Sequence, residues 1–129
     1  MAYETFERTT TRSEKPMLSV LPDSRITFNA AASRLLKAKR IRAVKILWDK
    51  DRCGIAFPAV DKDDRNAYSI FFNRGRAATI SPKSFLNYIG WSAKKSQTVP
   101  VKWNSERDML EAELPFKFVS TYERNMEGH

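Results

Sequence analysis

The sequence contains few of the residues that build catalytic and metal centres. Its 129 residues include one cysteine, Cys53, and one histidine, His129, at the last position. A lone cysteine excludes an intrachain disulfide and a cysteine-based metal cluster. A histidine-dependent triad or a zinc site built from histidine and cysteine also has too few ligands. We therefore expect no metal site and no catalytic residues, and an enzyme is the least favoured functional class.

Glycine and long apolar runs are scarce as well. The four glycines show no spacing typical of a phosphate-binding loop, and we expect no cofactor. No segment resembles a signal peptide or a membrane span, which predicts a cytoplasmic protein without a membrane partner. Because 42% of the residues are hydrophobic and 12% are aromatic, the chain can still bury a core.

Residues 24–58 have the pattern of a strand, a helix, a strand, a turn and a strand. A short apolar strand precedes Asn29, which is a typical N-cap for the helix that follows as far as Lys39. Apolar residues then alternate over residues 43–48 and return after the polar turn at residues 49–54.

Residues 78–115 show the same order of elements. A strand leads into a helix at Pro82–Gly90, with proline at its start and glycine at its stop. Val99, Val101 and Trp103 then alternate as the first hairpin strand does, and the turn at residues 104–108 follows. The sequence thus predicts an α+β protein with a mainly antiparallel, barrel-like sheet formed by two β-α-β-β pseudo-repeats, each with one short helix.

The two pseudo-repeats are expected to form a single barrel domain over residues 16–118. Residues 1–15 are predicted to be a flexible N-terminal arm, and residues 119–129 a C-terminal tail. The segment Pro16–Pro22 predicts a short edge strand, because its prolines lack the amide hydrogen that a central strand donates. Residues 68–72, followed by a hairpin turn, form a strand inserted between the repeats, for which only Met17–Leu21 offers a counterpart.

Positive charge is concentrated in two segments without acids. The formal net charge is +8, and residues 24–48 and 65–105 each contain seven basic residues and no acid. Such segments favour a polyanion, with duplex DNA as the leading partner and RNA or single-stranded DNA as further options. The predicted nucleic-acid contacts are Arg25, Arg34, Lys37, Lys39, Arg40, Arg42, Arg74, Arg76, Lys83, Lys94 and Lys95.

The segment from Arg25 to Leu36 resembles the swapped-hairpin DNA-binding domains of the AbrB, SpoVT and MraZ type. These open with a Gly-Arg-hydrophobic-hydrophobic-Pro segment that runs into a short helix, and Ile80–Gly90 is similar. The resemblance implies interleaved hairpins in one barrel, formed by a tandem chain or by a homodimer. It also implies that Arg25 and Arg34 contact DNA, as the family's strand and helix arginines do.

The sequence departs from the family pattern at four places. Ser24 stands where the family has glycine, and Asn29 where it has proline. In the second copy, Ala78 and Asn87 stand where Arg25 and Arg34 are in the first. The two halves are therefore expected to contact DNA differently.

Other features favour structural or alternative roles. Trp48 and Trp103 extend apolar strand faces, so packing is favoured over base stacking. Glu111 and Glu113 are expected on a solvated strand face, and Cys53 is expected to be an ordinary thiol.

The leading hypothesis is a small DNA-binding protein and transcriptional regulator. The alternatives are a non-enzymatic adaptor or structural module that binds an acidic protein, and an RNA or single-strand binder.

Overall fold

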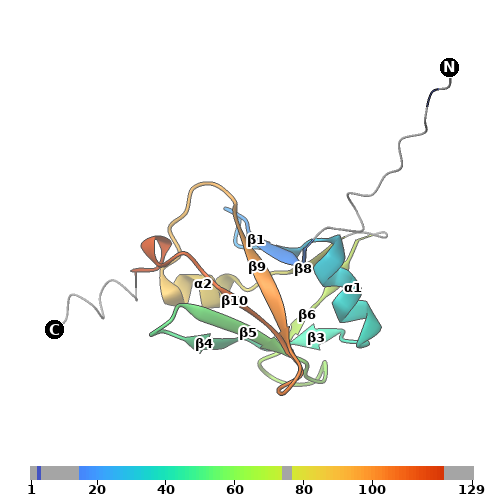
Figure 1. Cartoon of the computed structure of the whole chain (residues 1–129). Helices are drawn as coiled ribbons and strands as arrows, with labels where there is room; N and C mark the ends of the chain where they lie inside the picture. The colour runs from blue at the N-terminus through green and yellow to red at the C-terminus, as the bar shows by residue number, and fades with distance from the viewer. Residues whose placement is uncertain (1–2, 4–14, 74–76, 121–129) are drawn as a thin grey trace.

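The computed structural model describes residue 3 and residues 15–73 and 77–120. The fold is α+β, with two helices and a curled antiparallel sheet that forms a half-barrel (Figure 1). The eight-stranded sheet has the order β4-β5-β10-β9-β1-β2-β8-β7, and β3 and β6 form a separate pair. The strands are β1 (Met17–Val20), β2 (Ile26–Phe28), β3 (Ala43–Val44), β4 (Leu47–Asp49), β5 (Gly54–Pro58), β6 (Tyr68–Ser69), β7 (Phe71–Phe72), β8 (Ala78–Ile80), β9 (Gln97–Asn104) and β10 (Met109–Glu113).

Helix α1 (Ala30–Ala38) begins and ends as its local sequence requires. The Asn29 Oδ1 accepts hydrogen bonds from the backbone N–H groups of Ala32 and Met17, each at 3.0 Å, which caps the helix and ties it to β1. At the other end, the Ile41 N–H donates to the Leu36 carbonyl at 2.9 Å and Arg40 has a φ of +58°. This is a Schellman motif, in which a left-handed residue ends the helix.

Helix α2 (Lys83–Ile89) ends in the same motif with a glycine. Gly90 has a φ of +67°, and the Trp91 N–H donates to the Leu86 carbonyl at 3.0 Å. The side chain of Ser120 lies directly against the Gly90 Cα, where a Cβ would collide with it. Pro82 lies at the N-cap, just before the first helical residue. The short three-residue 3₁₀ helix η1 (Phe116–Phe118) follows β10.

The prediction of an edge strand at Pro16–Pro22 is wrong, because β1 is a central strand. It pairs with β2 on one side and with β9 on the other. The two prolines lie outside Met17–Val20, so every residue of the strand keeps its amide hydrogen. Leu18 and Val20 are completely buried, as a central strand requires.

Strands β6 and β7, which the sequence predicted as one strand, have different partners. The predicted strand at residues 68–72 is interrupted at Ile70, whose N–H donates to the Arg42 carbonyl. This break allows β6 to pair with β3 while β7 pairs with β8. The pair β7–β8 is antiparallel, as is β1–β2.

The two hairpins, β4–β5 and β9–β10, have closely similar turns. Trp48 lies opposite Ile55 in the first, and Trp103 lies opposite Leu110 in the second. The side chain of Asp49 accepts a hydrogen bond from the N–H two residues ahead, and Asn104 does the same in the second turn. Cys53 and Asp108, one residue before the return strand of each, both have a φ of +52°.

The core is formed by the inner face of the curled sheet and the apolar faces of both helices. Phe28 and Phe57, at most 1% exposed, meet edge to face with ring centroids 5.3 Å apart, and Leu36 and Ile89 come from the helices. Val119 is fully buried and forms a β-bridge with Trp91, so the folded body includes the start of the predicted tail.

Candidate nucleic-acid interface

Helix α1 and the residues that follow it present five of the nine predicted contacts that lie in the described residues. Arg34, Lys37, Lys39, Arg40 and Arg42 are all exposed. The helix buries Ala31, Ala32 and Leu36 instead, which places the cations on its solvent side. The basic surface of the first half is therefore formed by one short helix and its exit.

Two of these lysines lie over aromatic rings. The Lys37 Nζ lies 5.5 Å from the ring centroid of Phe72, and the Lys39 Nζ lies 5.0 Å from that of Trp103. A cation over an aromatic face is stabilised by the ring quadrupole while its outer side stays in water. Both ammonium groups are thus held at the surface by aromatic residues of the sheet.

Arg25 is positioned by the tight turn between β1 and β2. The Leu21 N–H donates to the Arg25 carbonyl at 2.8 Å, and Ser24 has a φ of +71°. The Arg25 Nε lies 2.8 Å from the Asp23 carboxylate, and both side chains are about half exposed. An exposed pair of this kind is weak, so Arg25 can exchange Asp23 for another anion.

The second half contributes fewer described cations. Lys83 is the first residue of α2, and Lys94 and Lys95 lie in the loop between α2 and β9; all three are exposed. Arg74 and Arg76 lie outside the described residues. In Figure 1, α1 and α2 lie on either side of β9, so the cations of the two helices belong to separate parts of the surface.

Few of these cations are neutralised within the protein. Among residues 15–73 and 77–120, the ion pairs are Arg25 with Asp23 and Arg52 with Glu113. The other described candidate cations form no ion pair with a described acid. Their charge is therefore available to an external polyanion.

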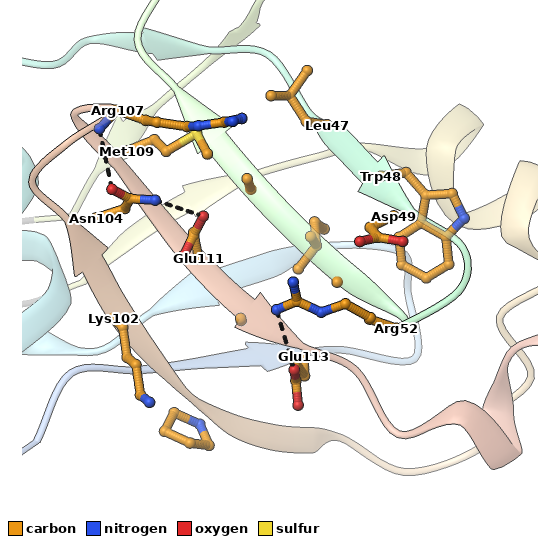
Figure 2. Close-up of a pocket in the computed structure, with 15 residues that line it drawn as sticks. Leu47, Trp48, Asp49, Arg52, Lys102, Asn104, Arg107, Met109, Glu111 and Glu113 are labelled. Carbon is orange, nitrogen blue, oxygen red and sulfur yellow. Dashed lines mark hydrogen bonds and ion pairs between the residues drawn. The ribbon is translucent and has the colours of Figure 1, made fainter.

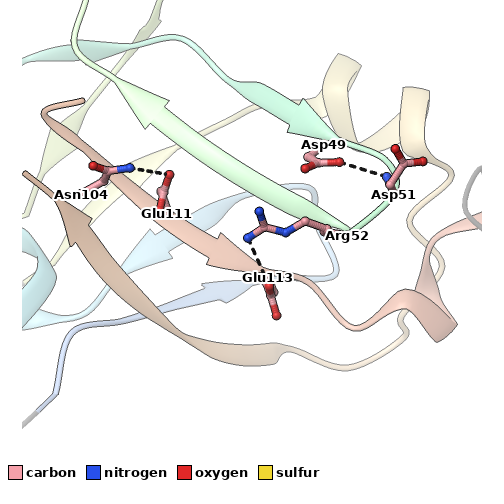
Figure 3. Close-up of polar contacts among 6 residues, drawn as sticks. All are labelled: Asp49, Asp51, Arg52, Asn104, Glu111 and Glu113. Carbon is pink, nitrogen blue, oxygen red and sulfur yellow. Dashed lines mark hydrogen bonds and ion pairs between the residues drawn. The ribbon is translucent and has the colours of Figure 1, made fainter. Parts of the chain in front are cut away.

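A second charged surface lies on the outer face of β4, β5, β9 and β10 (Figure 2). This groove of about 900 Å³ contains Arg52, Lys102 and Arg107, together with Asp49, Glu111 and Glu113. The expectation that both glutamates are merely solvated is only partly met. The Asn104 side chain donates to Glu111 at 3.0 Å, and the Arg52 side chain lies 3.7 Å from Glu113 (Figure 3). Because acids and bases alternate here, this face does not attract a polyanion.

The remaining candidate for chemistry, Cys53, is buried in the first hairpin turn. Burial, and then the carboxylates of Asp49 and Glu113, raise the pKa of its thiol above the ordinary value. A thiol with a raised pKa is mostly protonated near neutrality and reacts slowly. The structure thus supports an ordinary cysteine and not an activated nucleophile.

Sequence reasoning missed a row of hydroxyl groups on the outer face of the sheet. Thr98, Ser19, Thr27 and Thr79 are neighbours on four adjacent strands, and the Ser19 and Thr98 hydroxyls are hydrogen-bonded at 2.7 Å. The signal was present, since these residues alternate with buried Val20, Ile26 and Ile80. Only the strand order, which is non-local, brings them together.

Comparison of the chain with protein-family models, with curated proteins and with solved structures finds no match. Within the part of the chain that the structure describes, no helix is long and apolar enough to cross a membrane. No group of three or more His, Cys, Asp or Glu side chains in that part could hold a metal ion.

Proposed function

We propose that this chain is a small DNA-binding protein of the swapped-hairpin type and acts as a transcriptional regulator. It contacts duplex phosphates through Arg25 and through the basic surface of α1 and its exit. The observation that carries this proposal is the group of exposed cations at Arg34–Arg42 without a described acidic partner. Each phosphate that such a group neutralises releases counterions, which favours binding at moderate salt.

The strand pairing supports a chain built from two interlocked pseudo-repeats. Each repeat consists of a hairpin, a helix and a second hairpin. The first repeat contains strands β1 and β2, helix α1 and strands β3 to β5. The second repeat contains strands β6 to β8, helix α2 and strands β9 and β10. The first strand of each repeat pairs with the second hairpin of the other, through β1–β9 and β3–β6. The pairs β2–β8 and β5–β10 join like strands of the two repeats. Exchange of the repeats leaves this pattern unchanged, as a pseudo-twofold axis requires.

The helices also contact the opposite repeat. Phe85 of α2 packs edge to face on Trp48 of the first repeat, with centroids 5.6 Å apart. Lys39 at the end of α1 lies over Trp103 of the second repeat. Each helix therefore covers the tryptophan of the other repeat, which is the arrangement expected of swapped hairpins.

The backbone at Ser24 supports the family resemblance where the side chain departs from it. A φ of +71° is a conformation that glycine adopts without steric cost, and the family has glycine at this position. The backbone of this turn is thus one that glycine would favour, which supports the resemblance although the residue is serine.

A titration of labelled duplex DNA, followed by fluorescence anisotropy at two salt concentrations, tests the proposal. We expect the affinity to decrease as the salt concentration rises. In Arg34→Ala/Arg40→Ala, the magnitude of the slope of log affinity against log salt should be smaller by about 1.8, which is about 0.9 for each lost phosphate contact. The control Lys50→Ala/Lys62→Ala removes the same charge from loops rich in acids and should leave the slope unchanged. If both double variants have the same slope, α1 does not contact the DNA. Absence of binding at low salt would favour the adaptor alternative and an acidic protein partner.

A further inference from the structure

A groove between Arg25, which precedes β2, strand β8 and the β6–β7 segment has no assigned role. Its volume is about 430 Å³, and it is lined by Arg25, Ser69, Phe71, Thr79 and Ser81, with Ala67, Tyr68 and Asn73 completing the wall. Its lining contains one cation, two aromatic rings, three aliphatic hydroxyls and an amide, and the acid next to the cation is Asp23, which pairs with Arg25 at 2.8 Å but does not line the groove. A lining of this composition accepts an anion and a planar ring together.

The strand register places the cation and the exposed ring within reach of one ligand. Phe71 lies opposite Thr79, and Ser81 follows Ile80, which lies opposite Ile26, so Arg25 lies next to Ser81. Arg25 and Phe71 are thus two strands apart and two residues apart along the sheet, roughly 10 Å by 7 Å between backbone positions. An extended arginine side chain spans much of this distance, so one ligand can contact both groups when it replaces Asp23 as the partner of Arg25.

Phe71 differs from its neighbour in a way that points to a ligand. Phe72 packs against the core and lies beneath Lys37, whereas the Phe71 side chain is 66% exposed. A phenyl ring at that exposure buries only about a third of its surface in the fold, so most of its face is open to a ligand. At the edge of a groove whose lining contains no acid, it offers a platform on which a base can stack.

This groove has no counterpart in the first repeat. The row Thr98, Ser19, Thr27, Thr79 and Phe71 runs across five strands, and the pseudo-twofold exchange would relate Phe71 to Ser19. Ser19 instead shares a 2.7 Å hydrogen bond with Thr98 and carries no ring. A ligand of the groove therefore binds on one side of the axis only.

We propose that this groove binds one unpaired nucleotide of the DNA, with its base stacked on Phe71 and its phosphate held by Arg25. The inference rests on the proposed DNA-binding function and adds a preference to it. A duplex that contains a bulged or mismatched base already has a base outside the stack, and so it binds more tightly than a perfect duplex. Because Ser19 and not an aromatic residue lies at the described position related to Phe71, the protein binds such a site in one orientation.

Anisotropy titrations of a perfect duplex and of the same duplex with one unpaired base test this inference. We expect the bulged duplex to bind about 5- to 150-fold more tightly, the range that corresponds to stacking of one base on an aromatic ring. Phe71→Val, which suits a strand, should abolish this preference, and Phe71→Tyr should retain it. The control Tyr88→Ala removes a comparably exposed aromatic ring, 68% exposed, from α2 and should retain it as well.

A fluorescent base analogue at the unpaired position provides a readout that affinity does not. Its emission should be quenched on binding to the wild-type protein and to Phe71→Tyr, but not to Phe71→Val. If both duplexes bind with equal affinity and the same salt slope, the nucleotide site is overturned and the proposed function stands. If neither duplex binds in a salt-sensitive way, the proposed function is overturned and this inference with it.

Discussion

Arg40 occupies a backbone position at which glycine would be less strained. It has a φ of +58° at the end of α1, and the equivalent residue after α2 is Gly90. A left-handed conformation costs a residue with a Cβ about 1–2 kcal/mol, part of which glycine loses again through its greater freedom when unfolded. The presence of a cation at a strained position agrees with a role in binding.

Replacement of Arg40 by glycine should therefore separate stability from binding. We expect Arg40→Gly to raise the free energy of unfolding in urea by about 0.5–1 kcal/mol and to weaken duplex binding. Arg40→Ala keeps the strain, so it should weaken binding to the same extent without the gain in stability. If Arg40→Gly is more stable and binds DNA as tightly as the wild type, Arg40 is not a DNA contact.

Cys53 should make the stability of the fold depend on pH in the alkaline range. Its thiol pKa is raised in the folded state, first by burial and then by Asp49 and Glu113. The folded protein thus holds this proton more tightly than the unfolded chain. The resulting stability is complete below the ordinary cysteine pKa of about 8.5 and is lost as the pH rises through the higher folded pKa.

Unfolding in urea between pH 8 and pH 11 would measure this effect. The free energy of unfolding should fall more steeply with pH in the wild type than in Cys53→Ala, which has no thiol to ionise. The two proteins share their lysines and tyrosines, so the difference between their curves isolates Cys53. Parallel curves would mean that the thiol titrates alike in both states.

At the scale of elements, the end of α2 depends on a close approach of the C-terminal segment. The Ser120 side chain lies against Gly90, and the Gly90 backbone is left-handed. Gly90→Ala should lower the free energy of unfolding by at least about 1 kcal/mol, since it adds both conformational strain and a collision. In the Gly90→Ala background, Ser120→Gly should restore the part due to the collision, as a double-mutant cycle in urea would show. If the second change restores nothing, the collision is relieved by movement of the chain.

Local sequence patterns predicted the helices and strands well, but they predicted less well which strands pair with each other. The Asn29 cap, the glycine stop at Gly90 and the matching hairpins depend on nearby residues, and the structure contains all of them. The central position of β1 depends on β9, which is about 80 residues away. Proline at each end of β1 suggested an edge because the sequence does not show which residues pair across such a distance.

At the scale of the whole molecule, the candidate site was predicted in part. The charges of α1 are visible in the sequence because acids are missing from residues 24–48. The hydroxyl row and the groove beside Phe71 were not predicted, because each combines residues from both halves of the chain. Sequence patterns identify what a helix presents to solvent, whereas an outer sheet face depends on the strand order.

The interlocked pairing predicts that neither half of the chain folds alone as a monomer. A fragment of residues 1–62 would lack β6, β8, β9 and β10, with which four of its strands pair, and the fragment 63–129 would lose the same pairings. Each fragment would therefore expose unpaired strand edges and half of the common core. We expect each to be unfolded or self-associated, and an equimolar mixture to recover the native amide spectrum by NMR.

Cleavage of the folded chain provides the matched control. Lys62 and Asp63 lie in an exposed turn between the two halves, so a protease site introduced there should be cut without loss of the native spectrum. If either purified fragment is a folded monomer, the pairing between the halves is not what holds the half-barrel together. Recovery on mixing would instead show that the two halves complete one another, since β1 with β9 and β3 with β6 are contacts that neither half can make within itself.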